Sequence, residues 1–433
     1  MLKRLYYILL LILTGVGFWA LGTRFIHGMS VTNLTSYFSW GLWVVFYIFF
    51  IGLSAGSFLL STMIYVFKMH ALEKVGRMSL LSALFSLIAG LMFVLIDLGH
   101  PERFWHTLVY RNMSSVLAWE INFYLLYILL VLGELWLVMR DDLSDMASNQ
   151  SGIRGTLGRI LSLGYRTSPT PERRTKQVHT AESWVKILGM IGLPLALGVH
   201  GGTGSIFAVQ IAKPYWNSSI VTIIFIVSAL VSGSALITFL YAFFGERDSE
   251  KPNVLASLTN LLILFIGVDL ILVFAEFLVG LYSGIPADMQ SFNAVLYGQY
   301  GLIFWIGQIG LAAVVPIFLI SLSRKNGSEV MKGLAGLSTV IGIIAVRINL
   351  ILPAYVSPQL PGLENAYVDS RLVYSYFPSS IEILSSLGII AFVVLLFSVA
   401  WELLPIVSNS GHQTSGRRTE HHGINSKGST HSA

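Results

Sequence analysis

The chain has 433 residues, of which 55% are hydrophobic and only 11% charged, and its formal net charge is +5. Ordinary globular proteins carry about 25% charged residues, so this composition excludes a secreted disulfide scaffold, a nucleic-acid-binding domain and a soluble dinucleotide-binding enzyme. The apolar residues come in runs long enough to cross a bilayer, which takes about 20 residues per helix. Together these features predict an all-α, polytopic membrane protein. The sequence has no cysteine, which excludes disulfides, Cys-ligated iron–sulfur clusters, zinc–thiolate sites and c-type haem in this protein.

Hydropathy predicts about ten membrane-spanning helices. The first follows Lys3 and Arg4 and superficially resembles a signal peptide. No small-residue cleavage pattern follows it, so we interpret it as a retained helix. Several runs are longer than a bilayer requires, which indicates tilted helices. The predicted spans are Leu5–Leu21, Phe38–Phe67, Met78–Leu98, Val116–Met139, Trp184–Ile211, Ser218–Phe244, Val254–Tyr282, Tyr300–Leu322, Leu334–Pro353 and Ile381–Val407.

The basic residues predict the orientation. With these spans, 21 of the 27 lysines and arginines fall on one face, five on the other, and Arg347 inside a span. Because cytoplasmic loops are enriched in Lys and Arg, both termini are predicted to be cytoplasmic, and the segments Asp97–Ser115 and Ala354–Ser380 to face outward. The basic loop 140–183 has too few apolar residues for a core and is interpreted as a cytoplasmic linker. The polar tail from Ser408 is predicted to be disordered, with its four histidines solvated rather than metal-bound.

A weak internal repeat is visible. Ala55-Gly56-Ser57 in the second span corresponds to Ser232-Gly233-Ser234 in the sixth. This correspondence predicts two parallel four-helix repeats, spans 2–5 and 6–9, with the first and last helices peripheral. Small residues that serve packing alone would give the same spacing. The predicted divisions are 1–37 (first helix and outer loop), 38–211 and 212–353 (the two bundles), 354–407 (outer loop and last helix) and 408–433 (tail).

Few ionisable residues lie inside the predicted spans, where each costs several kcal/mol unless it is paired. Helical rise places most of them toward the outer face. Glu382 and Glu402 lie near span ends and are predicted to reach the interface by snorkelling. The full set is Asp97, Glu120, Glu134, His200, Asp269, Glu276, Arg347, Glu382 and Glu402.

Spacing relates some of these groups to one another. Asp269 and Glu276 are seven residues apart and share one helix face. Glu120 and Glu134 lie about 21 Å apart along one helix. This pair is consistent with two stations of a proton path; the alternative, two unrelated interface acids, is favoured for Glu134.

His200 is the single histidine inside a predicted span. A membrane b-type haem needs two axial ligands, so one histidine argues against a cytochrome b. A lone buried histidine near carboxylates suits a hydrogen bond to a quinone carbonyl and proton exchange at neutral pH; the alternative is a packing histidine bonded to a backbone carbonyl. The following Gly201-Gly202-Thr203-Gly204 favours close approach by a flat ligand or another helix, or a break in the helix.

Two outer segments mix charged and aromatic residues. One runs from Asp97 to His106 and includes His100, and the other runs from Arg371 to Phe377. This pattern predicts a docking surface for an extracytoplasmic partner, and an interfacial aromatic belt explains part of it.

An ordered set of motifs resembles the NrfD/PsrC family, the membrane subunits of polysulfide-reductase-type respiratory complexes. The resemblance is closest to the ten-helix branch that includes the HybB and DsrP subunits and those of alternative complex III, and it covers about residues 5–406. The motifs are Gly52-Leu53-Ser54-Ala55-Gly56, Asp97-Leu98-Gly99-His100-Pro101, Ser115-Val116-Leu117-Ala118-Trp119-Glu120, His200 to Ser205, Arg347-Ile348-Asn349, and Tyr376-Phe377-Pro378-Ser379 with Glu382.

The resemblance implies a quinone-interacting subunit of a respiratory oxidoreductase in a prokaryotic cytoplasmic (inner) membrane. Menaquinone or ubiquinone would be an exchangeable substrate, with no haem, iron–sulfur cluster or metal in this protein. Partners would be an extracytoplasmic iron–sulfur (ferredoxin-like) subunit and further catalytic or cytochrome subunits. Some members of the family are proposed to couple quinone chemistry to proton translocation. Carried over to this sequence, the quinone site would comprise His200, Asp97 and Glu120 with His100, and the candidates for proton movement would be Glu134, Asp269, Glu276 and Arg347.

Three hypotheses follow from the sequence. The first is the quinone-dependent membrane subunit, which is not catalytic alone. The second is a secondary transporter or proton-conducting protein, against which the outward clustering of polar groups argues, because transport sites lie near the midplane. The third is a structural anchor for a redox enzyme, which would leave Asp269, Glu276 and Arg347 without a reason for burial.

Overall fold

The computed structural model describes residues 2–358, 362, 369 and 372–406. Within them, ten helices are long and apolar enough to cross a membrane. The prediction of an all-α, multi-pass membrane protein with ten spans is therefore confirmed. Arg371 and the tail from Ser408 lie outside the described residues.

The spans are joined by short helices. The eighth span begins as a π-helix, η4 (Ile303–Val314), and continues as α11 (Val315–Asn326). The other spans are α1 (Leu2–His27), α2 (Leu42–Tyr65), α3 (Gly76–Asp97), α5 (Val116–Asn149), α7 (Pro171–Ala208), α8 (Ser219–Phe244), α9 (Lys251–Tyr282), α12 (Glu329–Ile351) and α14 (Ser380–Leu403). The connecting elements are η1 (Gly28–Val31), η2 (His70–Val75), η3 (Pro101–Arg103), α4 (His106–Val109), α6 (Gly152–Leu161), α10 (Pro286–Leu296) and η5 (Leu352–Tyr355).

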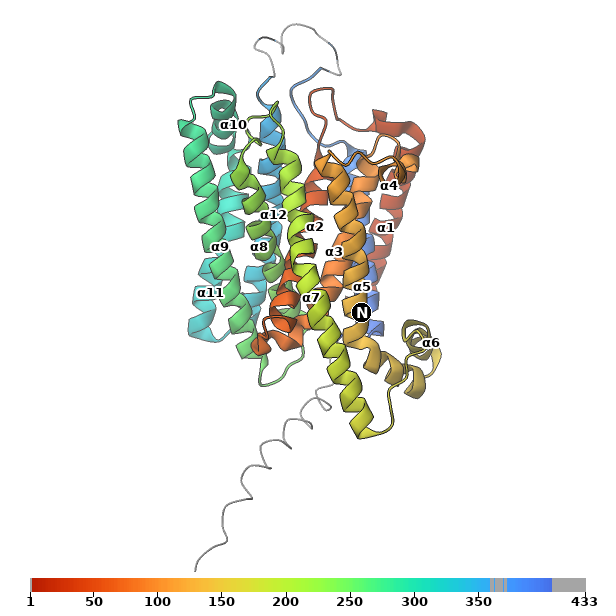
Figure 1. Cartoon of the computed structure of the whole chain (residues 1–433). Coiled ribbons are helices and arrows are strands. Elements are labelled where there is room, and N and C mark those ends of the chain that lie inside the picture. Colours follow the sequence, from red (N-terminus) through yellow and green to blue (C-terminus); the bar gives the residue numbers. More distant parts are fainter. Residues whose placement is uncertain (1, 359–361, 363–368, 370–371, 407–433) are drawn as a thin grey trace, which may run out of the picture.

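The long helices form two neighbouring groups (Figure 1). In the first, α2 packs against α3 and α7, and α5 packs against α3 and α7. In the second, α8 packs against α9 and α12, and α12 also packs against η4 and α11. The helices α1 and α14 pair with each other and contact the first group through α3. This arrangement agrees with the predicted repeats, whose division of the sequence stays a prediction.

The two groups meet where α2 crosses α8. A Cβ atom at Gly56 would lie 2.9 Å from the backbone nitrogen of Gly233 and closer still to the carbonyl of Ala229. The glycines of the two matching sequence motifs thus face each other, and only residues without a side chain let the two backbones come this close.

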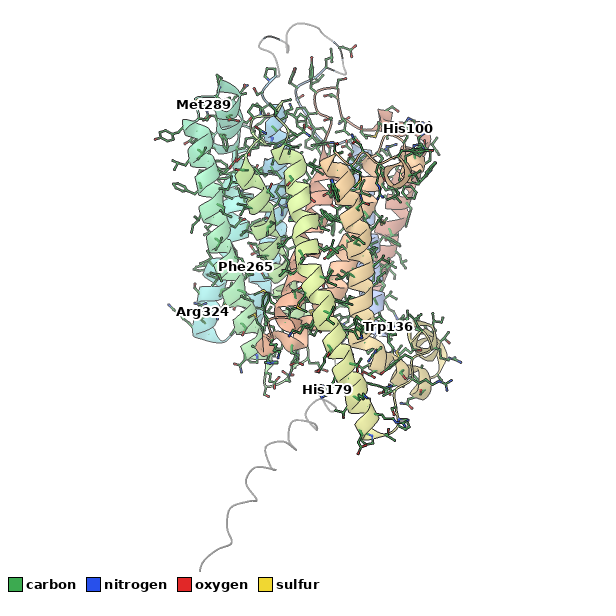
Figure 2. All side chains as sticks on the ribbon, viewed as in Figure 1. His100, Trp136, His179, Phe265, Met289 and Arg324 are labelled. Atoms are coloured by element: carbon green, nitrogen blue, oxygen red, sulfur yellow. The ribbon has the colours of Figure 1, made fainter. Side chains whose placement is uncertain are left out.

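The two ends of the molecule differ. We call the end with Arg324 and His179 the basic end and the other, with His100 and Met289, the His100 end (Figure 2). Lys3 of α1 pairs with Glu402 of α14 at 2.9 Å, so the start of α1 and the end of α14 lie together at the basic end. Glu402 is partly exposed there, as expected for an acid at a span end.

The prediction that Glu382 snorkels to the interface was wrong. Its side chain is fully buried (0% exposed) at the start of α14. It accepts hydrogen bonds from the backbone N–H groups of Ser379 (2.9 Å) and Asn33 (3.0 Å) and from the hydroxyl of Tyr376 (2.5 Å). With Ser379 it forms a capping box, so Glu382 fixes the start of α14 instead of reaching water.

The prediction of a linker at 140–183 was also wrong. Helix α5 continues to Asn149, α6 follows, and α7 begins at Pro171. The extension is held by apolar and polar contacts together. Leu143 and Met146 of α5 are buried in the hydrophobic core, Arg174 pairs with Asp145 at 3.0 Å, and the Tyr165 hydroxyl donates to Asp141 at 2.8 Å. The few apolar residues of this segment thus extend the core of the whole protein.

Replacing Gly56 by alanine should loosen the α2–α8 crossing. The added methyl group has no space between the two backbones, and overpacking of this kind costs roughly 1–3 kcal/mol. We expect a lower melting temperature of the purified protein. Gly267→Ala in α9 is the matched control, since a Cβ atom there meets nothing within 4 Å. Equal melting temperatures for the two variants would contradict the proposed role of the crossing.

Replacing Glu382 by alanine should also destabilise the fold. Two backbone N–H groups and the Tyr376 hydroxyl would lose their acceptor, and each buried polar group left unpaired costs roughly 1–3 kcal/mol. Thermal unfolding should show a clear loss of stability, whereas Glu402→Ala, at an exposed ion pair, should change it by about 1 kcal/mol or less. A smaller effect for Glu382→Ala than for Glu402→Ala would refute the capping role.

Candidate functional site

Glu120 of α5 lies at the centre of a buried polar cluster, with only 1% of its surface exposed. Its Oε1 accepts hydrogen bonds from the hydroxyls of Tyr47 (2.7 Å) and Tyr124 (2.7 Å), and a short one from Thr203. The other carboxylate oxygen, Oε2, has no hydrogen-bond partner among the described residues. One oxygen is thus held by three hydroxyl groups of the protein, and the other is left without a partner.

The Glu120 cluster, defined as Glu120, Tyr47, Tyr124 and Thr203, joins three helices. Tyr124 follows Glu120 by one turn of α5, so the two share a face. Tyr47 reaches the cluster from α2 and Thr203 from α7. The Tyr47 and Tyr124 hydroxyl oxygens lie 2.7 Å apart, so either hydroxyl can donate to the other in place of Glu120. The packing of α5 and α2 against α7 therefore assembles the cluster.

The same face of α5 continues toward the basic end. Tyr127 donates a hydrogen bond to the backbone carbonyl of Ser54 at 3.2 Å. Two turns further, Glu134 is buried, and its Oε1 has no hydrogen-bond partner among the described residues. Glu120, Tyr124, Tyr127 and Glu134 thus form one polar stripe along α5, which we call the α5 stripe.

His200 of α7 lies close to this cluster, three residues before Thr203, and is 1% exposed. Within the described part of the chain neither of its ring nitrogens meets the geometry of a hydrogen bond. The polar group nearest in effect is the backbone of Phe225, and the Phe225 ring centre lies 5.3 Å from that of His200. A Cβ atom at Gly52 would lie 3.4 Å from His200 Nε2 and 3.1 Å from Arg347 Nη2. The missing side chain of Gly52 therefore leaves the space that His200 and Arg347 share.

The glycines after His200 do not break the helix, because α7 continues to Ala208. They permit close packing instead: a Cβ atom at Gly204 would lie 3.0 Å from the Cα atom of Thr222 in α8. Of the two structural expectations, close approach by another helix is correct and the helix break is wrong.

Arg347 of α12 brings a positive charge to the same region and is also 1% exposed. Its Nη2 donates to the Ser228 hydroxyl at 2.9 Å, and its guanidinium lies 5.1 Å from the centre of the Phe225 ring. Asp269 of α9 is the acid whose charge acts on it. A cation from the second group of helices thus stands beside the unpaired histidine of the first.

The structure brings Glu120, His200 and Arg347 into one region but leaves other predicted residues outside it. Asp97 ends α3 and is influenced by the charges of Arg24 and Glu382. In the described residues, no hydrogen bond joins it to Glu120 or His200. His100 lies in an exposed loop, where it bonds Glu102 at 3.0 Å. Its position at the end of the molecule is visible in Figure 2.

The other predicted acids occupy separate places. Glu276 accepts a hydrogen bond from the Ser218 hydroxyl at 3.0 Å, Asp269 lies near Arg347, and Glu134 lies further along α5. No group of three or more His, Asp and Glu side chains is arranged to hold a metal ion in the described ranges.

Sequence reasoning missed Tyr47, Tyr124, Thr203 and Ser228, which supply the hydrogen bonds around Glu120 and Arg347. The signal for two of them was available. Tyr124 follows Glu120 by four residues and Thr203 follows His200 by three, which are the helical spacings for neighbours on one face. Tyr47 and Ser228 come from other helices, so no local spacing indicates them.

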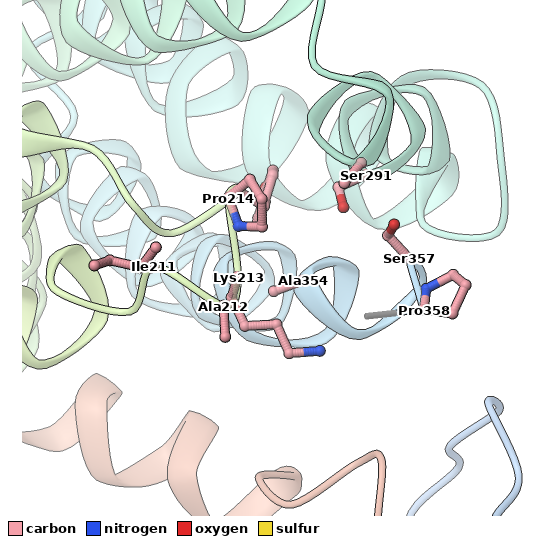
Figure 3. A pocket seen from close by; sticks show the side chains of 10 residues that line it. Ile211, Ala212, Lys213, Pro214, Ser291, Ala354, Ser357 and Pro358 are labelled. Carbon is pink, nitrogen blue, oxygen red and sulfur yellow. The ribbon is translucent and has the colours of Figure 1, made fainter. Parts of the chain in front are cut away.

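A separate pocket of about 230 Å³ opens at the His100 end (Figure 3). Lys213, in the loop between α7 and α8, lines it, with its Nζ 4.4 Å from the centre of the Tyr355 ring, and burial lowers the pKa of this lysine. The remaining lining residues are Ile211, Ala212, Pro214, Tyr215, Ala287, Ser291, Ala354, Ser357 and Pro358. This pocket offers a cation and two hydroxyls to a molecule approaching that end.

Comparison with known proteins identifies the family to which this chain belongs. The family model described as polysulphide reductase, NrfD, matches residues 30–359, which includes the Glu120 cluster, His200 and Arg347. The chain belongs to the NrfD polysulphide reductase family.

Curated relatives of this NrfD-family protein align over most of its length. A selenate reductase subunit of Mesobacillus selenatarsenatis is 51% identical over 97% of this chain and 98% of its own. A polysulfide reductase subunit of Wolinella succinogenes is 26% identical over 72% of this chain and 93% of its own. The integral membrane subunit of a menaquinone reductase of Nitratidesulfovibrio vulgaris is 22% identical over 90% and 89%. The resemblance inferred from the sequence motifs is thus confirmed.

Proposed function

We propose that this protein is the quinone-interacting membrane subunit of a reductase complex, with the quinone head group beside His200 and Glu120. The observation that carries the proposal is that three of the buried polar atoms without a hydrogen-bond partner among the described residues belong to one region: both ring nitrogens of His200 and Oε2 of Glu120. Buried polar groups are normally hydrogen-bonded, so a ligand that bonds them accounts for their burial. The relatives support it, since they are named as reductase subunits, one of them a menaquinone reductase.

The arrangement suits exchange of two protons with a quinol. A ring nitrogen of His200 would bond one quinol oxygen and take its proton, and the free Oε2 of Glu120 would take the second proton; both protons would be returned when a quinone is reduced. The hydroxyls of Tyr47, Tyr124 and Thr203 hold the other carboxylate oxygen in place, so proton transfer would not require the carboxylate to turn. Positioned acid–base groups of this kind contribute typically 10²–10⁴-fold to a rate.

Protons could move away from the site along the α5 stripe. Tyr124, Tyr127 and Glu134 follow Glu120 on one helix face, toward the basic end. Asp269 beside Arg347, and Glu276 at the outer part of α9, are the corresponding candidates in the second group of helices. In this proposal these groups move protons, and only His200 and Glu120 contact the quinone head group.

Electrons would pass to or from a partner at the His100 end. Without cysteine this protein has no thiolates to hold an iron–sulfur cluster, so we propose an extracytoplasmic iron–sulfur subunit. Two features support docking there: the loop with His100 and Glu102, and the pocket lined by Lys213. The excess of Lys and Arg at the basic end supports a cytoplasmic location for that end, with the start of α1 and the end of α14.

His200→Ala and Glu120→Gln should each lower the kcat/KM for quinol at least about 10-fold in the purified complex, since each removes a group that bonds or takes a proton from the substrate. Quinol oxidation followed by absorbance measures this, and the melting temperature checks assembly. His70→Ala is the matched control, because His70 is exposed at the basic end and its side chain pairs only with Glu73 among the described residues.

Normal turnover in both variants would refute the site assignment. If the wild-type complex turned over no quinol, while proteoliposomes with this protein alone accumulated a solute, the protein would be a transporter and the quinone proposal would fail.

A further inference from the structure

The short helix α6 rests on the basic end of the molecule, beside the lower part of α5 (Figure 1). It packs on α5 through glycines: a Cβ atom at Gly158 would lie 2.6 Å from the backbone nitrogen of Ala147. This close contact buries the glycine face of α6 against the protein. The opposite face is left without a protein neighbour in the described structure.

That opposite face is apolar. Ile153 is 73% exposed, Ile160 is 61% exposed, and Leu163, just beyond the helix, is 76% exposed. Ile153 and Ile160 are seven residues apart and so lie on one side of the helix. Soluble proteins rarely leave such large apolar side chains together in water.

Basic side chains border this apolar face. Arg154 and Arg159 belong to α6 and Arg166 follows it. The Arg154 guanidinium donates to the backbone carbonyl of Glu402 at 2.6 Å, and Glu402 in turn pairs with Lys3. The first residues of α1 and those of α6 therefore place basic side chains at one level of the molecule, where both contact Glu402 at the end of α14.

Contacts with α5 indicate where that level lies relative to the membrane-spanning part of the helix. The Trp136 indole donates to the carbonyl of Leu161 at the end of α6, at 3.0 Å, and Trp136 lies beside α6 in Figure 2. Tryptophan is enriched at membrane–water interfaces. Above it, Leu129 and Leu132 of α5 are exposed on the span itself, so the apolar face of α6 continues a lipid-facing surface.

We propose that α6 lies in the membrane interface, with Ile153, Ile160 and Leu163 inserted among the acyl chains and Arg154 and Arg159 bound to anionic lipid headgroups. An apolar face flanked by basic residues is the composition that binds such surfaces, and the attraction grows with each Lys or Arg near an anionic surface. The proposal needs only that the ten helices cross a bilayer, so it stands independently of the quinone site.

Because the sequence has no cysteine, one introduced cysteine can be labelled specifically to measure how deeply α6 lies in the membrane. A single cysteine introduced by Ile160→Cys, in the full-length protein within its complex, would carry a nitroxide in nanodiscs containing phosphatidylglycerol. The spin label should be more accessible to oxygen than to a water-soluble nickel chelate. Leu129→Cys is the control within the membrane, and Glu172→Cys, exposed at the start of α7, is the control in water. Nickel accessibility at position 160 equal to that at position 172 would overturn the proposal and indicate a soluble protein partner instead.

The headgroup contacts have their own test. The double variant Arg154→Gln/Arg159→Gln should retain fewer phosphatidylglycerol molecules than the wild type in native mass spectrometry of the purified complex. Arg173→Gln, at the exposed start of α7, is the control for loss of a basic charge and should retain as many as the wild type. Equal retention by the double variant and the wild type would overturn the assignment of these arginines.

Discussion

Gly52 and Gly56 lie one turn apart on the same face of α2, and the close approach they permit brings His200 and Arg347 together. At Gly56 the backbone of α8 crosses α2 against Gly233. At Gly52 the missing side chain leaves space for His200 of α7 and Arg347 of α12. Because α12 packs on α8, the crossing at Gly56 also determines how near Arg347 comes to His200. Small residues four apart are the usual means by which membrane helices achieve such contact.

Some buried ionisable groups have hydrogen-bond donors on their polar atoms, and others have polar atoms without a partner. The difference matters in a bilayer, because an unpaired polar atom is costly there. Glu382 has backbone and hydroxyl donors on its carboxylate and serves the start of α14. Glu120 has donors on one oxygen only, and His200 has none on either nitrogen in the part of the chain described. The unpaired atoms of these two residues lie together between α2, α5 and α7, whereas others, such as those of Asp97 and Asp269, lie elsewhere. Their juxtaposition favours a ligand site over a purely structural anchor.

Much of the fold could be predicted from the sequence, because long apolar runs leave few alternatives to membrane helices. The buried ionisable residues could be named for the same reason. The hydroxyl partners Tyr47 and Ser228 could not, because their contacts depend on helix crossings that no local spacing encodes. The spacing of Ser379 and Glu382 did contain a capping-box signal. The segment 140–183 was misjudged because its few apolar residues, such as Leu143 and Met146, join the core of the whole protein, and ion pairs such as Arg174 with Asp145 add to this packing.

The most direct test of the quinone site is a binding titration of the intact complex with a quinol-analogue inhibitor, wild type beside His200→Ala. The ten tryptophans of this protein provide a fluorescence signal, and Trp40 lies near His200 through Phe207 and Phe225. The account predicts saturable quenching in the wild type and its loss in a variant whose melting temperature is unchanged. Equal affinity in the two proteins would contradict it and place the quinone elsewhere in the complex.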